Sequence, residues 1–519
     1  MSLARNFLTV GSGTALSRVL GFVRDVMVAA MLGSGAIADA FVVAFRLPNL
    51  FRRLLSEGAF NAAFIPIYAR IEAEEGAGGV ARFGGRVISV LLLGLIALTL
   101  LCEIGMGTVV GLLAPGFTKD PEKMMLTVWL SRIAFPFLAC ATLASVFTGM
   151  LNARRRFTVA AFAPVALNVV LCGALGAAGL AGWSGTRIAA VWLCWGVAFG
   201  GLVQLAICVI GIRRARVPLK LQRPELDPAV RRLLTLSVPG ILASGIAQVN
   251  AFVGTIIGSG APGVVSYLYY ADRVYQLPLG IVGVAIGIVL LPDLARRLAA
   301  GDVEGAQRAQ SRALEFAFFL TLPAAVALAV AARPIVEVLF EHGAFDAAAT
   351  RESAATLAAF AVGLPGYVIA KALQPAFFAR EDMRVPLIIA CIGVAADVII
   401  AVALFSSLQH VGIAIAASAA GWINAAALAF ILHRRNQLRV GRRTSARMGL
   451  TLLASAAMGA ALYFGVGTLA PWLTAAQPLA VKAGALVVLC GGGFGVFVFI
   501  ARLIGAVDPR NLREVLHKA

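Results

Sequence analysis

Apolar stretches of similar length follow one another along most of the chain and are separated by short polar stretches. A helix needs about 20 mostly apolar residues to cross the hydrocarbon layer of a bilayer. The stretches that meet this requirement lie at 7–31, 36–56, 86–113, 126–151, 159–182, 187–211, 231–257, 264–292, 313–341, 353–379, 385–406, 410–433, 446–470 and 479–505. The pattern therefore predicts an all-α polytopic membrane protein with fourteen transmembrane helices.

Basic residues between these stretches indicate the topology. Thirty lysines and arginines lie at the two ends of the chain or in loops after even-numbered helices, whereas six lie in loops after odd-numbered helices. Because cytoplasmic loops attract Lys and Arg, both termini are predicted to be cytoplasmic. One helix too many or too few would mix the two groups, so their separation supports the count of fourteen.

Composition excludes an ordinary soluble protein. The chain has 519 residues, of which 60% are hydrophobic and 13% are charged. A soluble protein of this length has too little polar surface to cover so many apolar side chains. The formal net charge of +19 would suggest nucleic-acid binding in a soluble chain. Here the predicted cytoplasmic loops account for most of that charge, so no nucleic-acid partner is predicted.

Three short motifs occur twice, in the same order. The pairs are 33–36 with 258–261, 64–76 with 290–301, and 152–159 with 378–385, each at an offset of 225 or 226 residues. The offset spans six predicted helices, an even number, so the two copies have the same orientation in the membrane. Transporters built from such parallel repeats place the substrate route between the two halves.

The repeat predicts a division of the chain into four parts. Residues 1–212 form an N-lobe of helices 1–6, 213–230 form a cytoplasmic linker, 231–434 form a C-lobe of helices 7–12, and 435–519 hold helices 13 and 14 and a cytoplasmic tail. The substrate route is expected between the N-lobe and the C-lobe.

Several arginines interrupt the predicted helices. They are Arg18 and Arg24 in helix 1, Arg46, Arg52 and Arg53 in helix 2, and Arg273 in helix 8. An arginine at the centre of a bilayer costs roughly 2.5–3.5 kcal/mol on insertion scales, so such residues face one another or a water-filled interior. Helices 1, 2 and 8 are therefore predicted to line a cationic cavity between the two lobes.

Two interpretations of these charges compete. One is internal neutralisation, for example between Arg24 and Asp39 or between Arg18 and Asp25. It leaves a surplus, because the three helices hold six arginines and only three aspartates, which are Asp25, Asp39 and Asp272. The surplus favours an anionic ligand, and the planar guanidinium group of arginine suits the two-point geometry of phosphate.

Four segments of the chain resemble the MurJ/MviN family, within the multidrug/oligosaccharidyl-lipid/polysaccharide exporter superfamily. They are SRVLGFVRD (17–25), DAFVVAFRLPNLFRRLLSEGAFNAAFIPI (39–67), NARRRF (152–157) and YYADRVYQLPLGIVG (269–283). The resemblance extends over essentially the whole chain and includes the fourteen helices. It implies a flippase that carries lipid II, the lipid-linked peptidoglycan precursor, from the inner to the outer leaflet of the bacterial cytoplasmic membrane by alternating access.

The resemblance and the helix faces together give a set of site residues. The predicted substrate-binding residues are Ser17, Arg18, Arg24, Asp25, Asp39, Arg52, Arg53 and Arg273. The resemblance implies that four of the arginines, all except Arg53, contact the diphosphate of lipid II. Arg53 lies on the same face of helix 2 as Asp39, which matches an acidic position of the family.

Some members of the family bind sodium in the second lobe, which gives a second candidate site. Asp397 in helix 11 and Asn424 in helix 12 match this site, and their oxygen atoms suit a hard cation. No cofactor other than this coupling ion is predicted. The chain has no G-x-x-x-x-G-K-[ST] motif, so ATP is not expected to drive transport directly.

The partners expected from the resemblance are lipid II, the surrounding membrane lipids and proteins of cell-wall synthesis. We expect a monomer in the bacterial cytoplasmic membrane and no catalytic residues, because moving a lipid requires no covalent chemistry.

Three other functions are compatible with part of the pattern. A flippase for another undecaprenyl-diphosphate-linked oligosaccharide would use the same arginine cavity. A cation-coupled drug antiporter would need an acidic or neutral cavity, which the arginines argue against. An enzyme acting on the lipid diphosphate would need paired carboxylates, whereas the intramembrane acids here are dispersed among helices.

Overall fold

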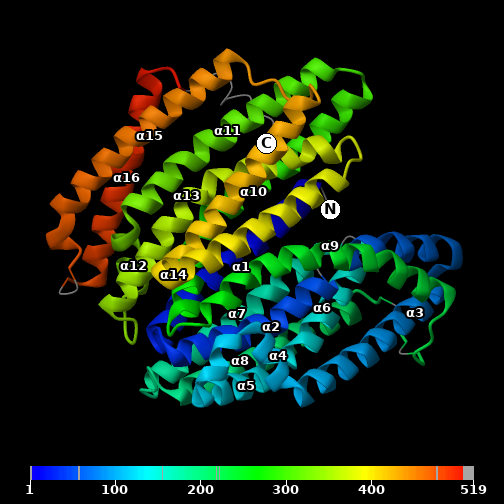
Figure 1. Cartoon of the computed structure of the whole chain (residues 1–519). Coiled ribbons are helices and arrows are strands. Elements are labelled where there is room, and N and C mark those ends of the chain that lie inside the picture. The colour runs from blue at the N-terminus through cyan, green and yellow to red at the C-terminus, as the bar shows by residue number, and fades with distance from the viewer. Residues whose placement is uncertain are drawn as a thin grey trace. The chain divides into compact units, whose positions relative to one another are not determined.

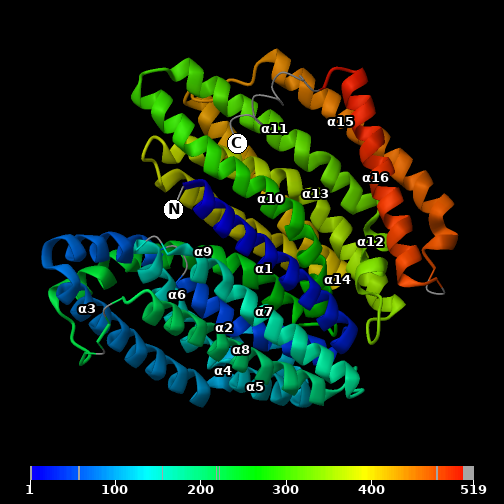
Figure 2. The same ribbon diagram turned by 180° about the vertical axis from the view of Figure 1, so that it is seen from behind.

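The structure is a computed structural model, and it describes residues 3–56, 59–154, 156–217, 219–220, 222–474 and 477–506. Within this part of the chain the regular secondary structure is entirely helical (Figures 1 and 2). The predicted all-α fold class is therefore confirmed. The helices fall into two compact units.

The first unit contains the described residues up to Ser266 and the short segment His342–Asp346. Its elements are α1 (Leu3–Leu32), α2 (Ala36–Ser56), α3 (Ala59–Ile104), α4 (Met106–Leu113), the 3-10 helix η1 (Pro115–Lys119), α5 (Pro121–Ala134), α6 (Phe137–Ala153), α7 (Phe157–Leu180), α8 (Arg187–Arg214), α9 (Pro228–Gly258) and the start of α10 (Val264–Ala299). Helix α7 packs against both α1 and α8, and α9 packs against α2 and α3.

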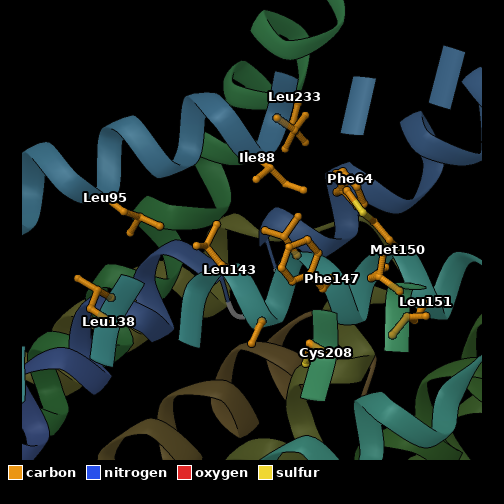
Figure 3. Close-up of a cluster of buried hydrophobic side chains, with 14 of the residues drawn as sticks. Phe64, Ile88, Leu95, Leu138, Leu143, Phe147, Met150, Leu151, Cys208 and Leu233 are labelled. Atoms are coloured by element: carbon orange, nitrogen blue, oxygen red, sulfur yellow. The ribbon is translucent and has the colours of Figure 1, made fainter. Parts of the chain in front are cut away.

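A large apolar cluster holds the first unit together. Phe64 and Ile88 of α3 meet Phe147 and Met150 of α6, and Cys208 of α8 lies in the same buried cluster (Figure 3). Lipid tails are as apolar as these side chains, so close van der Waals packing rather than exclusion of water stabilises such contacts within a membrane. Leu47 of α2 belongs to the same cluster, so this packing also fixes the position of α2.

The second unit contains Tyr267–Glu341 and the described residues from Ala347 onward. Its elements are the rest of α10, α11 (Val303–Val330), α12 (Ala332–Phe340), α13 (Ala347–Phe378), α14 (Arg384–Arg434), α15 (Arg442–Leu469), the 3-10 helix η2 (Ala470–Trp472) and α16 (Leu479–Leu503). Helix α13 packs between α11 and α14, while α15 and α16 form an adjacent pair at the end of the chain (Figure 1). Helix α14 is interrupted at Gln409, whose φ is 44°.

Each predicted transmembrane stretch coincides with a helix, part of a helix or two consecutive helices. The stretches 385–406 and 410–433 are the two arms of α14 on either side of Gln409. In the described part of the chain, nine helical segments are long and apolar enough to cross a membrane. Helices α1 and α2 are not among them, in keeping with the polar and charged residues that they carry. The count of fourteen crossings stays a prediction.

One feature of the backbone conformation occurs in both copies of the predicted repeat. Gly76 and Gly301, which are 225 positions apart, both adopt a left-handed conformation, with φ values of 66° and 75°. Both glycines are the last residues of the repeated motif that contains Pro66 and Pro292. The boundaries of the predicted lobes stay a prediction. The two compact units divide the chain differently, because α9 lies in the first unit with the helices that precede it.

Candidate functional site

Arg24 is the centre of a polar network inside the first unit. Its guanidinium group donates hydrogen bonds from Nε (3.0 Å) and Nη2 (2.7 Å) to Oδ1 of Asp25, and from Nη1 (2.9 Å) to Oδ1 of Asn168 on α7. The guanidinium carbon lies 5.1 Å from the centre of the Phe45 ring on α2. The Arg24 side chain is only 12% exposed, so the charge is held in one orientation by three helices.

Asn168 connects this network to Ser17. Its Nδ2 atom donates to the backbone carbonyl of Ser17 at 3.0 Å and lies 3.5 Å from the Ser17 hydroxyl. Gly21 faces the same amide, and a Cβ atom there would lie 3.6 Å from Nδ2. The structure thus joins Ser17, Arg24 and Asp25, which were predicted together, and adds Asn168. An uncharged residue in another helix, 144 positions from Arg24, gives no signal in the sequence.

Arg18 lies apart from this network. Its side chain is exposed and lines an open cavity between α1 and α7. Among the described residues, no carboxylate forms an ion pair with Arg18. Arg18 is therefore a cation with no acidic neighbour within ion-pair distance in the described part of the chain.

Asp39 is fully buried at the start of α2, where it joins three parts of the first unit. Its Oδ2 accepts hydrogen bonds from Nζ of Lys123 (2.7 Å) on α5 and from the backbone N–H of Gly263 (2.9 Å). Its Oδ1 accepts from the backbone N–H of Ser266 (2.8 Å), in the first turn of α10. A carboxylate at a helix N-terminus is stabilised by the unpaired N–H groups there. Contact between Asp39 and substrate stays a prediction.

Lys123 was not predicted as a site residue, because it lies in the loop between the predicted stretches 86–113 and 126–151. Its ammonium group pairs with Asp39 and lies 4.0 Å from the centre of the Phe117 ring. The two partners are 84 positions apart, and neither charge is unusual for a residue near a helix end. Because the pairing depends on how α2 and α5 pack, hydropathy and spacing alone do not reveal it.

The remaining arginines of α2 have different surroundings. Arg46 donates from Nη1 to the hydroxyl of Thr255 on α9 at 3.0 Å. Arg52 is half-buried and donates from Nε to Oδ1 of Asn49 at 3.3 Å, one turn earlier on the same helix. Arg53 is exposed in the last turn of α2. Of the two α2 arginines predicted to bind substrate, Arg52 is therefore partly enclosed and Arg53 is exposed.

Arg273 lies on α10 in the second unit. Its Nη2 is 3.9 Å from Oδ2 of Asp272, and its guanidinium carbon lies 4.6 Å from the centre of the Tyr269 ring. Asp272 also accepts a hydrogen bond from Gln276. Arg273 therefore lies beside an aromatic ring and at the edge of ion-pair distance from Asp272. The predicted cavity that it shares with Arg18, Arg24 and Arg52 stays a prediction, because those residues belong to the first unit.

The structure contradicts both internal ion pairs considered from the sequence. Arg24 pairs with its neighbour Asp25 rather than with Asp39, and Asp39 pairs with Lys123. Asp39 therefore forms no ion pair with the six arginines of the predicted cavity, which are Arg18, Arg24, Arg46, Arg52, Arg53 and Arg273. Among the described residues, Asp25 lies beside Arg24 and Asp272 lies beside Arg273.

The candidate sodium residues lie on the two arms of α14. Asp397 is buried, and a Cβ atom at Gly393, one turn before it, would lie 2.5 Å from both Oδ1 and Nδ2 of Asn424. In the described part of the chain, Oδ1 of Asp397 and Oδ1 of Asn424 are both buried without a hydrogen-bond partner. Buried oxygen atoms of this kind are compatible with a hard cation, and the sodium site stays a prediction.

The chain is similar to known proteins along almost its whole length. Residues 28–481 match the family model described as lipid II flippase MurJ. The chain is 45% identical to a probable lipid II flippase MurJ of Rhizobium meliloti (strain 1021), over 99% of this chain and 96% of that protein. It is 36% identical to the lipid II flippase MurJ of Burkholderia cenocepacia, over 76% of each chain.

Solved structures have the same fold. A lipid II flippase MurJ in an inward closed conformation aligns with a TM-score of 0.78 and 23% identity, over 96% of this chain and 98% of that chain. An inward-facing multidrug resistance transporter of the MATE family aligns with a TM-score of 0.63 and 15% identity, over 81% of this chain and 94% of that chain.

Proposed function

Because the chain belongs to the lipid II flippase MurJ family, we propose that it carries lipid II from the inner to the outer leaflet of the bacterial cytoplasmic membrane. The observation that supports the mechanism most strongly is the enclosed Arg24 network. Asp25 and Asn168 fix the plane of the guanidinium group, and the Phe45 ring covers it. An oriented guanidinium group is the side chain best suited to a diphosphate, because it forms two parallel hydrogen bonds to phosphate oxygen atoms.

Transport by alternating access follows from this chemistry. The sugar and peptide head of lipid II cannot cross hydrocarbon unaided, so it needs a polar path through the protein. Arg18, Arg24, Arg52 and Arg273 bind the diphosphate in a cavity open to the cytoplasm, while the hydrocarbon tail stays in the lipid. Movement of the two lobes then exposes the cavity to the other side. No bond is made or broken, and the matched family is one of flippases.

The energy source is a separate part of the proposal. Moving one charge across 100 mV is worth about 2.3 kcal/mol, so the membrane potential is sufficient to bias such a cycle. Asp397 and Asn424 would hold a coupling sodium ion through their buried oxygen atoms, which lack hydrogen-bond partners in the described part of the chain. A bound ion would supply counter-charge for Asp397 in the interior of the second unit.

A complementation experiment tests the proposal. Arg18, Arg24, Arg52 and Arg273 are each replaced by alanine in cells depleted of their own lipid II flippase. We expect loss of growth with normal membrane insertion, because each variant removes one cation from the diphosphate site. Arg308→Ala is the matched control, since Arg308 is 68% exposed and forms a surface ion pair with Glu304. Normal growth of all four variants would contradict the diphosphate site.

A further inference from the structure

A cavity of ≈ 340 Å³ lies between α1 and α7 in the first unit. The helices approach closely at its edge, where a Cβ atom on Gly13 would lie only 2.7 Å from the Cβ atom of Ala161. Residues of α1, α7 and the end of α6 surround the opening. Glycine at position 13 thus permits the close contact that defines one wall of the cavity.

One part of the cavity lining is polar. It includes the exposed guanidinium group of Arg18, the hydroxyl of Ser17 and the side chain of Asn152 from the last turn of α6. In the described part of the chain, Oδ1 of Asn152 is buried and has no hydrogen-bond partner. The amide nitrogen of Asn152 is not among the buried atoms without a partner, and as an N–H donor it suits an anionic ligand in the cavity.

The rest of the lining is apolar. Val10, Phe157 and Pro164 contribute hydrocarbon surface beside the Arg18 guanidinium group. A free phosphate or diphosphate ion would gain nothing from this surface. An anionic group attached to a hydrocarbon chain would contact both parts of the lining. The cavity volume is at the low end of the range for ligand sites, so it fits a phosphoryl group and a short length of chain but not a large sugar and peptide head.

The cavity is connected to the Arg24 network through the chain itself. Ser17 lines the cavity, and its carbonyl accepts the hydrogen bond from Asn168, which in turn accepts from Arg24. Arg18 and Arg24 are six residues apart on one helix, a rise of about 9 Å. The exposed arginine is therefore followed by an enclosed arginine along α1, in the direction away from the end predicted to be cytoplasmic.

We propose that this cavity is the first binding place for the phosphoryl group of the transported lipid and the adjoining part of its hydrocarbon chain, and that Asn152 is a substrate-binding residue there. The inference rests on the proposed flippase function and adds a step to it. The lipid first meets Arg18 and Asn152 in the open cavity, and its phosphoryl group then passes to Arg24.

Binding measurements on the purified full-length protein test this step. The probes are undecaprenyl diphosphate, phosphatidylglycerol and inorganic diphosphate. Asn152→Asp places a carboxylate next to Arg18, and Ala160→Leu fills the cavity. Hydrogen bonds to charged groups are worth about 1.5–3 kcal/mol, so we expect Asn152→Asp to weaken binding of undecaprenyl diphosphate at least about tenfold. Ala177→Leu, at an exposed position on α7 outside the cavity, is the matched control and should bind as wild type does.

The outcomes separate this inference from the proposed function. Suppose that both cavity variants have the melting temperature of wild type and bind undecaprenyl diphosphate with its affinity, while Arg24→Ala binds it weakly. The cavity is then not an entry site, and the flippase mechanism still stands. If Arg24→Ala also binds normally, the diphosphate mechanism fails as well. Equal losses for undecaprenyl diphosphate and phosphatidylglycerol would assign the cavity to bilayer lipids and overturn the inference. Tight binding of inorganic diphosphate would also overturn it, because the apolar lining would then be unnecessary.

Discussion

Individual charged side chains in this protein differ sharply in what surrounds them. Arg24 and Asp39 are both enclosed, yet Arg24 is held by groups of α1 and α7, whereas Asp39 is held by a lysine and two backbone N–H groups. Arg18 is exposed to a cavity. Asp39 therefore connects helices, whereas Arg18 and Arg24 are the residues that we propose to bind a ligand.

The Asp39 contact gives a prediction about stability. Lys123→Met removes the only side-chain cation that pairs with Asp39 among the described residues and leaves a buried carboxylate without a counter-charge. Removing one partner of a buried ion pair costs about 3–5 kcal/mol, so the melting temperature of the purified protein should fall clearly. The double variant Asp39→Asn with Lys123→Met should recover part of the loss, because it buries no unpaired charge.

An exposed ion pair in the same unit provides the control. Arg187 and Glu122 are 62% and 77% exposed, and such surface pairs contribute about 0–1 kcal/mol. The Arg187→Ala variant should therefore have a melting temperature close to that of wild type. A Lys123→Met variant that melts at the wild-type temperature would show that the buried contact does not stabilise the first unit.

Helix pairs in this protein depend on small residues at their contacts. In the second unit, a Cβ atom at Gly363 of α13 would lie 2.6 Å from the Cα atom of Ser418 on α14. The hydroxyl of Ser418 donates to the carbonyl of Ala359 at 2.7 Å, which holds the two helices at this separation. Small residues at membrane helix contacts permit this close approach.

Gly363→Ala should therefore destabilise the second unit. The added methyl group meets the Cα atom of Ser418, which cannot rotate away, and such overpacking costs about 1–3 kcal/mol. The same substitution at Gly484 of α16 is the matched control, because no atom lies within 4 Å of its Cβ position. Alanine is a better helix former than glycine by about 0.5–1 kcal/mol, so Gly484→Ala should melt at or slightly above the wild-type temperature. Equal melting of the two variants would refute the packing explanation.

Hydropathy predicted where the helices lie but not how they are joined. The interruption of α14 at Gln409 falls between two predicted stretches. Hydropathy separated them because the helical segment on each side of Gln409 is long enough to cross a bilayer by itself. By contrast, the packing of α9 into the first unit depends on contacts far apart in the chain. The sequence repeat relates α9 to α1, and similarity of sequence does not specify which neighbours a helix packs against.

The candidate site was predicted in a similar, partial way. Arginines in apolar segments are conspicuous, because their cost in lipid requires an explanation. Their partners are less visible, since Asn168 and Lys123 are ordinary residues that become important only when the helices pack. The sequence therefore identified the charged groups, and the structure identified the residues that orient or neutralise them.

In the chain as a whole, two groups of basic residues occupy different places. Most basic residues lie in loops on the side predicted to be cytoplasmic, where they orient the protein in the membrane. A small group lies within the predicted transmembrane stretches 7–31, 36–56 and 264–292, and consists of Arg18, Arg24, Arg46, Arg52, Arg53 and Arg273. We assign this second group to the binding of a lipid diphosphate.

Direct binding of lipid II to the purified full-length protein, compared between wild type and variants at Arg24, tests that assignment most directly. We expect Arg24→Ala to weaken binding at least about tenfold, since a hydrogen-bonded charge pair is worth roughly 1.5–3 kcal/mol. Arg24→Lys should restore only part of the affinity, because an ammonium group lacks the planar two-point geometry of a guanidinium group. Unchanged affinity in both variants, with normal melting, would contradict the claim that the enclosed arginine binds the diphosphate.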